Sequence, residues 1–203
     1  MSIASTSIIY PGVTLADDIV IEDFCIIGCP PHSGEIKPTV IESGSTIRSH
    51  TVIYSGNLIG TNFETGHKVN IRENNTIGKN VSIGTHSVIE HSITIEDNVR
   101  IHSQAFIPEF SILEEDCWIG PNVVLTNSKY PRSHLSKNNL MGPKIQKGAI
   151  IGANVTVLPG VVISEKTLIG AGSVICFDTE AFSVYVGNPA KLIKRRDEIK
   201  DYE

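Results

Sequence analysis

The chain has few of the residues that build several common kinds of protein. Aromatic residues make up 6% of its 203 residues, which argues against a sandwich or bundle whose core is filled by large rings. Four cysteines in a chain of this length do not form a disulfide framework, and the step from Cys25 to Cys29 is not that of a zinc knuckle. No stretch approaches the ~20 apolar residues of a membrane helix. The first residues lack the basic and apolar pattern of a signal peptide, so we expect a cytoplasmic protein with reduced thiols and no membrane partner.

Positive charge is also scarce. Lysine and arginine total 17 against 22 aspartates and glutamates, which gives a formal net charge of -5. Proteins that bind nucleic acid gather lysine and arginine on one surface to meet the phosphates. We therefore expect no nucleic-acid partner.

A six-residue repeat dominates what is present. From Ile41 to Leu125, fourteen of the fifteen residues at steps of six are Ile or Leu, with Thr65 as the exception. The same step recurs from Ile3 to Ile27 and from Ile145 to Ile175. A second column, four residues after the first, is mostly small or β-branched. This period fits neither an α-helix nor a plain alternating strand.

The repeat predicts an all-β fold. One large and one small inward side chain in every six residues suit short strands joined by tight corners, so that successive coils stack as a parallel β-solenoid. Two breaks interrupt it, at residues 28–40 and at 126–144. We expect one unit over 1–183 with an excursion loop at 126–144, because a loop leaving a regular scaffold is a natural place for function. A C-terminal tail over 184–203 should contain a short capping α-helix, since Pro189 is a helix-start signal and Leu192, Ile193 and Ile199 would form its apolar face.

Hexapeptide repeats, a loop after Ile119-Gly120-Pro121-Asn122 and a closing Gly-Asn-Pro-Ala-Lys-Leu-Ile-Lys segment (187–194) resemble the left-handed β-helix acyltransferases. This resemblance, not the period, implies a left-handed parallel β-helix over 1–183. It also implies a homotrimer with acetyl-CoA as co-substrate in the groove between neighbouring subunits.

The loop resembles a narrower group. Residues 119–127 followed by Pro131-Arg132-Ser133 are similar to bacterial N-acetyltransferases that act on nucleotide-linked amino sugars for lipopolysaccharide, capsule or S-layer pathways. Galactoside-type O-acetyltransferases usually carry Thr-His-Pro in this loop. The stretch from Thr126 to Pro131 has no histidine, so an amine acceptor is favoured over a hydroxyl.

The candidate catalytic residues are His67 and His86. His67 follows Thr65, where the Ile column fails and where Asn57 and Asn75 replace small apolar residues. A local failure of a strict pattern indicates a functional position. By resemblance, His67 falls on the first histidine of a Trp-His-Phe-Ser-His stretch in amino-sugar acetyltransferases. A neutral amine attacking the thioester in a ternary complex needs only an orienting or basic group.

The remaining candidates line the expected groove. Asn70 takes the place of the second histidine of the Trp-His-Phe-Ser-His stretch, and Arg72 is a further polar residue close to it. Gln104 is in the same column as His86, and Asn127 belongs to the excursion loop. The substrate-binding set is therefore Asn70, Arg72, Gln104 and Asn127. The resemblance implies that small residues of the last coils face the pantetheine arm and that tail lysines meet the CoA phosphates. The cofactor set is Gly152, Ala153, Ala171, Lys191 and Lys194.

Three alternatives stay open. One is a sugar O-acetyltransferase, and another is a non-catalytic solenoid used for assembly. The third is a metalloenzyme like the γ-class carbonic anhydrases, because the spacing of His50, His86 and His91 resembles their metal histidines. However, His86 and His91 each stand one residue further from the preceding inward Ile than the corresponding histidines of those enzymes do. A shift of one residue points the side chains in another direction. We therefore expect no metal.

Overall fold

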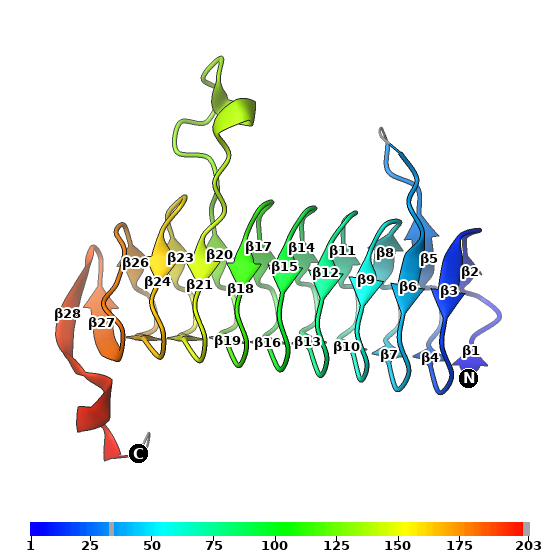
Figure 1. Cartoon of the computed structure of the whole chain (residues 1–203), viewed down its shortest axis with the longest axis horizontal. Coiled ribbons are helices and arrows are strands. Elements are labelled where there is room, and N and C mark those ends of the chain that lie inside the picture. Colours follow the sequence, from blue (N-terminus) through cyan, green and yellow to red (C-terminus); the bar gives the residue numbers. More distant parts are fainter. Residues whose placement is uncertain (33–34, 201–203) are drawn as a thin grey trace.

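The computed structural model describes residues 1–32 and 35–200 and is a parallel β-solenoid (Figure 1). Its short strands stack into three sheets that form the sides of a prism. Sheet A contains β1 (Ser2–Ile3), β4 (Val20–Ile21), β7 (Thr46–Ile47), β10 (Glu64–Thr65), β13 (Ser82–Ile83), β16 (Arg100–Ile101), β19 (Trp118–Ile119), β22 (Ile150–Ile151), β25 (Leu168–Ile169), β27 (Ser183–Gly187) and β28 (Ala190–Arg195).

The other two sheets follow the same order. Sheet B contains β2 (Ile8–Ile9), β5 (Ile26–Cys29), β8 (Val52–Tyr54), β11 (Asn70–Ile71), β14 (Val88–Ile89), β17 (Phe106–Ile107), β20 (Val124–Leu125), β23 (Thr156–Val157) and β26 (Val174–Ile175). Sheet C contains β3 (Val13–Leu15), β6 (Thr39–Ile41), β9 (Leu58–Ile59), β12 (Thr76–Ile77), β15 (Thr94–Ile95), β18 (Ile112–Leu113), β21 (Lys144–Ile145) and β24 (Val162–Ile163).

The predicted period sets the register. Most strands pair with the strand 18 residues further on, as Asn70 does with Val88. In most coils the second residue of each strand is the aliphatic one of the repeat and is buried, so the Ile columns form one continuous core. Because the backbone ladder follows the same step, each coil satisfies the N–H and C=O groups of its neighbours.

The corners require left-handed backbone. Asn62, Asn80 and Asn98 have φ values of 57°, 55° and 60° at successive corners between sheet C and sheet A. Asparagine tolerates this region better than other side-chain-bearing residues. Here its amide also links the coils, since Asn62 donates to Asn80 and Asn80 donates to Asn98, both at 3.0 Å.

The two interruptions leave from the same edge of the prism, between sheet B and sheet C (Figure 1). The first joins β5 to β6. The second joins β20 to β21 and contains the 3-10 helix η1 (Ser136–Asn139). The feet of the second meet, because the Met141 N–H donates to the Asn127 carbonyl at 2.8 Å. Sheet C then continues across the excursion, with Ile112 paired to Lys144.

The fold class predicted from the sequence is confirmed, but the predicted α-helix of the tail is wrong. The tail is an antiparallel hairpin of β27 and β28, followed by the 3-10 turn η2 (Arg196–Glu198). β27 adds to the open edge of β25, and satisfying that row of backbone groups outweighs a weak helix signal. Leu192 and Ile193, expected on a packed helix face, are exposed on β28. The division of the chain at residue 183 stays a prediction.

No helix among the described residues is long and apolar enough to cross a membrane.

Candidate functional site

The predicted site residues lie on two different edges of the prism. The corner between sheet A and sheet B, called here the histidine edge, includes residues 66–69, 84–87 and 102–105. The corner between sheet B and sheet C, called here the loop edge, includes residues 72–75, 90–93 and 108–111 and the feet of both loops. Sheet B separates the two edges within one chain.

His67 and His86 lie on the histidine edge in neighbouring coils. The backbone N–H of His86 donates to the carbonyl of His67 at 3.0 Å. The His67 ring is half exposed; its Nδ1 lies 2.9 Å from the Ser49 hydroxyl and 3.8 Å from a carboxylate oxygen of Glu22. The His86 ring is exposed on a left-handed corner with φ 62°. Both imidazoles are therefore accessible, and His67 is also oriented by its partners.

The predicted cofactor residues of the last coils share this edge. Gly152, Ala153 and Ala171 stand in the corner positions that follow β22 and β25, and Gln104 stands in the exposed corner after β16. Packing also requires glycine at position 152, because a Cβ atom there would lie 2.7 Å from the Ala171 backbone nitrogen. The Ala153 corner is three coils from His86 and four from His67, or about 14 and 19 Å at ~4.8 Å per coil.

Lys191 and Lys194 are exposed on β28. They lie on the strand that closes sheet A, beyond the last complete coil, so they stand at the same end of the prism as Ala171 (Figure 1).

Asn70, Arg72 and Asn127 lie toward the loop edge. Asn70 is the outward residue of β11, and its Oδ1 atom is buried without a hydrogen-bond partner. Arg72 is in the corner that follows β11, and Asn127 is a foot of the excursion. The structure thus brings Arg72 and Asn127 to the same edge and separates them from His67 and His86.

Arg72 connects the first part of a polar cluster. Its guanidinium binds the Glu73 carboxylate through two hydrogen bonds of 2.8 and 2.9 Å, and reaches Glu90 at 3.4 Å. It also lies over the Tyr54 ring, 5.2 Å from its centre. Bidentate pairing of this kind fixes the plane of the guanidinium as well as its position.

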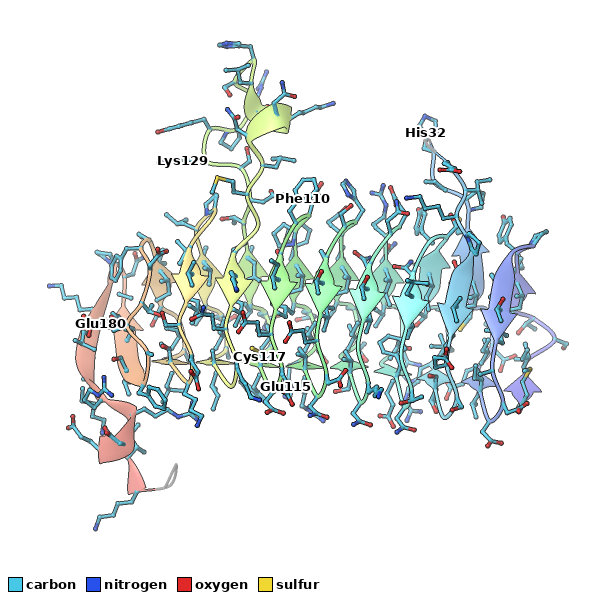
Figure 2. All side chains as sticks on the ribbon, in the orientation of Figure 1. His32, Phe110, Glu115, Cys117, Lys129 and Glu180 are labelled. Atoms are coloured by element: carbon cyan, nitrogen blue, oxygen red, sulfur yellow. The ribbon has the colours of Figure 1, made fainter. Side chains whose placement is uncertain are left out.

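His91, Glu109 and Asn127 form the second part. The Asn127 amide donates to a carboxylate oxygen of Glu109 at 2.7 Å. The other oxygen of Glu109 is 3.9 Å from Nε2 of His91, and Nδ1 of His91 is 3.2 Å from the Ser92 hydroxyl. The imidazole meets Phe110 edge to face at 5.7 Å, and Figure 2 shows Phe110 beside the base of the excursion. The loop foot is therefore linked to a histidine through a single carboxylate.

The pKa values of two acids of this cluster are shifted in opposite directions. Burial raises the pKa of the Glu90 carboxyl, and the nearby Glu109 and Glu73 carboxylates add to this while Arg72 opposes it. Burial also raises the pKa of Glu73, but the Arg72 hydrogen bond and charge outweigh it and hold that pKa below its usual value. Carboxylates with divergent surroundings are typical of functional sites.

Two hollows border the edges. One of about 360 Å³ lies between the first loop and the loop edge, and is lined by Pro31, Glu35, Lys37, Glu73, Asn74, His91 and Ser92. A smaller hollow of about 190 Å³ lies beside the histidine edge, over Gly66 and Gly84, with Arg48, Arg100 and His102 on its walls. Each edge thus has space for part of a ligand.

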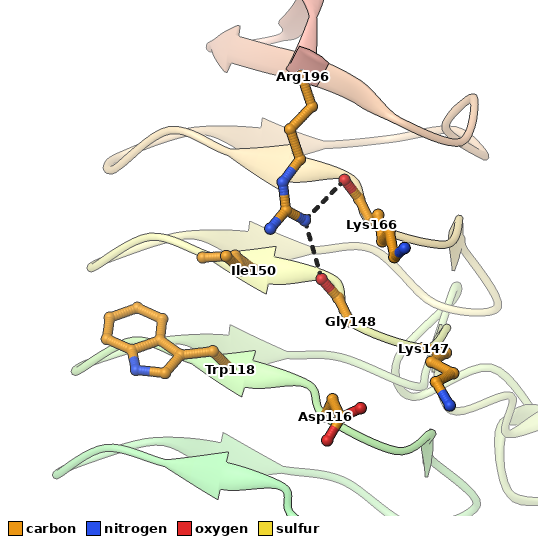
Figure 3. Close-up of a pocket in the computed structure, with 7 residues that line it drawn as sticks. All are labelled: Asp116, Trp118, Lys147, Gly148, Ile150, Lys166 and Arg196. Atoms are coloured by element: carbon orange, nitrogen blue, oxygen red, sulfur yellow. Dashed lines mark hydrogen bonds between the residues drawn. The ribbon is translucent and has the colours of Figure 1, made fainter. Parts of the chain in front are cut away.

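A larger cavity of about 480 Å³ lies elsewhere, on sheet A near the tail (Figure 3). Trp118 and Ile150 form its floor. Arg196 reaches across it and donates to the carbonyls of Gly148 and Lys166 at 3.0 and 2.9 Å. This arginine fastens the tail to the last coils, and the cavity contains none of the predicted site residues.

The departures from the repeat at Thr65, Asn57 and Asn75, which suggested function, have structural explanations. Thr65 is buried and its hydroxyl accepts the Arg48 N–H at 2.9 Å. Asn57 and Asn75 are buried and stacked; each accepts a backbone N–H of the next coil, and both donate to the carbonyl of Arg72 at 2.8 and 2.9 Å. Their role is to fix the corner that carries Arg72.

Sequence analysis missed Glu73, Glu90 and Glu109, and considered His91 only as a metal ligand. A signal was present, because Glu73, His91, Glu109 and Asn127 follow one another at steps of 18 residues. In a three-sided solenoid this step places them in one column on successive coils.

The three histidines of the metal alternative do not come together. His50 and His86 are on the histidine edge, whereas His91 is on the loop edge. Across residues 1–32 and 35–200, no three His, Cys, Asp or Glu side chains are grouped so that they could hold a metal ion.

Comparisons with known proteins identify the repeat. Residues 76–109 match the family model "Bacterial transferase hexapeptide (six repeats)", and residues 144–176 match "Hexapeptide repeat of succinyl-transferase". The UDP-N-acetylglucosamine acyltransferase of Bacteroides fragilis superposes with a TM-score of 0.65 at 16% identity, over 97% of this chain and 75% of that one. The corresponding enzyme of Francisella novicida gives 0.55 at 19% identity, over 97% and 71%. Two segments of the chain thus match hexapeptide-repeat models, and the chain has the left-handed β-helix fold of these solved structures.

Curated relatives carry acetyltransferase names. A Schizosaccharomyces pombe protein named for acetyltransferase activity is 38% identical over 81 residues, which is 38% of this chain and 39% of that protein. Serine acetyltransferase 2 of Arabidopsis thaliana is 45% identical over 56 residues, 28% of this chain and 17% of that protein. The chain thus spans about two fifths or less of the length of these relatives.

Proposed function

We propose that this protein transfers the acetyl group of acetyl-CoA to the amine of a nucleotide-linked amino sugar, in the synthesis of a lipopolysaccharide or related surface polysaccharide. The observation that carries this proposal is the loop edge, where the excursion foot Asn127 is joined to His91 through Glu109. The acetyltransferase names of the relatives support the reaction class. Both substrates belong to the cytoplasm, which is the proposed location.

The donor is proposed to lie along the histidine edge. Ala153 and Ala171 offer backbone groups beside small side chains, and a pantetheine arm extended parallel to the axis spans the three or four coils that separate them from the histidines. Lys191 and Lys194, at that end of the prism, provide positive charge for the CoA phosphates.

His67 and His86 are proposed to act at the thioester end of this arm. The Ser49 hydroxyl and the Glu22 carboxylate orient the His67 ring without burying it. An imidazole held in this way can orient a substrate or accept a proton. Gln104, one coil beyond His86 on the same edge, is proposed to contact the substrate.

A homotrimer is proposed because the two edges must cooperate. The outward residues of sheet B are mostly apolar: Ile8, Ile26, Val52, Val88, Phe106, Val124 and Val174. The excursion presents three further exposed apolar side chains, Tyr130, Leu135 and Met141. Apolar surface of this extent is typical of an interface. A second copy seated here would bring its histidine edge to the loop edge of the first, and could satisfy the buried Oδ1 of Asn70.

An amine acceptor fits the loop edge better than a hydroxyl. The excursion between Thr126 and Pro131 has no histidine. An amine also needs less activation than a hydroxyl once it is neutral, so positioning supplies much of the acceleration.

The test is acetyl-CoA-dependent release of free thiol with UDP-glucosamine and dTDP-linked 3-amino and 4-amino sugars, with the matching hydroxyl sugars as controls. Turnover of an amino sugar alone is the expected result. Release with hydroxyl sugars only would replace the amine by a hydroxyl acceptor. No release, together with no acetyl-CoA binding by calorimetry, would overturn the transferase proposal.

A further inference from the structure

The cavity of about 480 Å³ near the tail and the hollow of about 190 Å³ beside the histidine edge are neighbours on the outer face of sheet A. Trp118 and Ile150 form the floor of the cavity, and Arg100 lines the hollow. In the ladder Arg100 pairs with Trp118, which pairs with Ile150. On its other side Arg100 pairs with Ser82, and Ser82 pairs with Glu64. These five outward residues, called here the sheet A track, connect the two spaces along the solenoid axis.

The cavity end of the track is suited to a planar ring that carries negative charge. The Trp118 indole is half-buried and lies beside Ile150 on the next strand (Figure 3). Concave apolar sites of this kind typically bind ligands, and an indole stacks on any nucleobase. The charged groups that line the cavity are Lys147, Lys166, Arg196 and Asp116. Because Lys147 is already paired with Glu115, two further cations face one carboxylate, which favours an anionic group on the ring.

Arg100 is held in place without being neutralised. Its Nε donates to Nε2 of His102 at 3.2 Å, and the His102 ring contacts the Trp118 ring with 4.5 Å between ring centres. Within residues 1–32 and 35–200, no carboxylate oxygen lies within 4.0 Å of the Arg100 nitrogens. A guanidinium that is not paired with an acid suits a phosphate, which it binds through parallel hydrogen bonds. One imidazole therefore fixes the aromatic ring and the positive charge relative to each other.

The hollow end of the track leads toward His67. The hollow lies over Gly66 and Gly84, where packing leaves no room for a side chain: a Cβ atom at Gly84 would lie 2.3 Å from a backbone nitrogen of the next coil. His67 follows Gly66 directly on the histidine edge. From Trp118 to Glu64 the track covers three steps of the ladder, or about 14 Å. An extended nucleoside diphosphate sugar has a comparable length.

We propose that the nucleotide of the acceptor binds along the sheet A track, with its base on Trp118 and its diphosphate on Arg100. The linked amino sugar then reaches the hollow beside His67. The inference rests on the proposed acetyl transfer and names where its acceptor binds. His102 is a positioning residue, because it holds the indole and the guanidinium in one arrangement.

The donor carries similar chemistry, since acetyl-CoA also contains a base and a diphosphate. The length of the track favours the acceptor. Only two steps of the ladder separate Arg100 from Glu64, fewer than the three or four coils that the extended pantetheine arm spans. A base on Trp118 and phosphates on Arg100 therefore leave room for one sugar before His67, and not for that arm.

Fluorescence tests the base site directly, because Trp118 is the only tryptophan of the chain. Titration with UDP or with dTDP should quench its emission in a saturable way, since a stacked base changes the surroundings of the indole. Coenzyme A, which is proposed to bind along the histidine edge, should leave the emission unchanged. Failure of both UDP and dTDP to quench would overturn the inference, and so would quenching by coenzyme A at an equal or lower concentration.

Calorimetry with UDP or dTDP, whichever binds the wild type more tightly, measures what each group contributes. Trp118→Ala should raise Kd about tenfold through the loss of one base–aromatic stack. Arg100→Gln should raise Kd about tenfold through the loss of a charge-assisted contact to phosphate. Trp118→Tyr keeps a ring and should stay within about threefold of the wild type. Lys79→Gln, at an exposed lysine that lines neither space, is the matched control.

Thermal unfolding of each variant checks the fold, and Arg100→Gln replaces an exposed side chain. A Kd within about twofold of the wild type in both Trp118→Ala and Arg100→Gln would overturn the inference. A loss of acetyl-CoA affinity in these two variants, with the binding of UDP and dTDP unchanged, would also overturn it, since that result would assign the track to the donor.

Turnover separates this inference from the proposed function. Arg100→Gln should raise KM for the amino-sugar nucleotide about tenfold and leave kcat and the KM for acetyl-CoA unchanged. Thiol release with the same KM for the amino-sugar nucleotide in Arg100→Gln and the wild type would overturn the inference alone. No thiol release and no acetyl-CoA binding, with UDP or dTDP still quenching Trp118, would overturn the proposed function while the nucleotide site stands.

Discussion

Individual side chains in this fold are understood best from the coil above and the coil below. His102 illustrates this: its ring contacts the Trp118 ring of the next coil in a tilted arrangement, with 4.5 Å between ring centres, and its Nε2 accepts a hydrogen bond from Arg100. Burial lowers the pKa of this imidazole, and the Arg100 charge lowers it further. The folded protein therefore prefers neutral His102.

This preference predicts a loss of stability in mild acid. As the pH falls below about 6.5, the unfolded chain binds a proton at His102 that the folded chain does not, so stability falls until the lowered native pKa is reached. His102→Gln keeps an acceptor for Arg100 and removes the titration. The thermal midpoint of this variant should drop less between pH 7.5 and 5.5 than that of the wild type. The same drop in both would contradict the prediction, and exposed His134→Gln serves as the control.

At the scale of the element, each corner is fixed by side chains stacked inside the prism. Asn57 and Asn75 both bind the carbonyl of Arg72, so the corner that carries the guanidinium is anchored from within. The position of the Arg72 side chain in the loop-edge cluster therefore depends on two buried amides that contact none of the charged groups of the cluster.

Replacing Asn75 by Ala should cost about 3 kcal/mol of stability. The substitution leaves the buried Ile93 N–H without its acceptor at 2.7 Å and removes one donor from the Arg72 carbonyl. Chemical unfolding measures the change. Asn138→Ala, on the exposed excursion, should stay within about 0.5 kcal/mol of the wild type. A similar small change for Asn75→Ala would refute the anchoring role.

Sequence patterns predicted the strands of the solenoid but not the conformation of the tail. The Ile columns indicated short parallel strands, because a six-residue period has no other simple solution. Asn57, Asn75 and Thr65 were interpreted as functional, since a sequence alone does not reveal that their hydrogen bonds are satisfied inside the prism. The tail was expected to be a helix from Pro189 and spaced apolar residues, whereas the open edge of β25 decides its conformation.

The site was predicted only in part for a related reason. Arg72 and Asn127 belong to the loop-edge cluster, but they were grouped with histidines that lie on another edge. Chain proximity linked Arg72 to His67, although a corner and a strand separate them. The partners that complete the cluster stand 18 residues apart, a distance at which ordinary motifs are not sought.

At the scale of the whole molecule, the proposed trimer rests on the apolar outer face of sheet B. We predict that Phe106→Glu, in the middle of that face, weakens self-association at least about tenfold, because a charge would be buried at the interface. Sedimentation at several concentrations measures it. Thr94→Glu, on the outer face of sheet C, is the matched control. Unchanged mass for Phe106→Glu and loss of assembly for Thr94→Glu would move the interface to sheet C.

The closed feet of the excursion have a consequence for engineering. The Met141 N–H donates to the Asn127 carbonyl, and β21 continues the backbone ladder of β18. The segment between Asn127 and Met141 is therefore not needed for the pairing of the coils on either side. Loops of other lengths or sequences could be inserted between Asn127 and Met141 while the coils on either side keep their register. Specificity in such a scaffold can change by swapping one insert, with no redesign of the core.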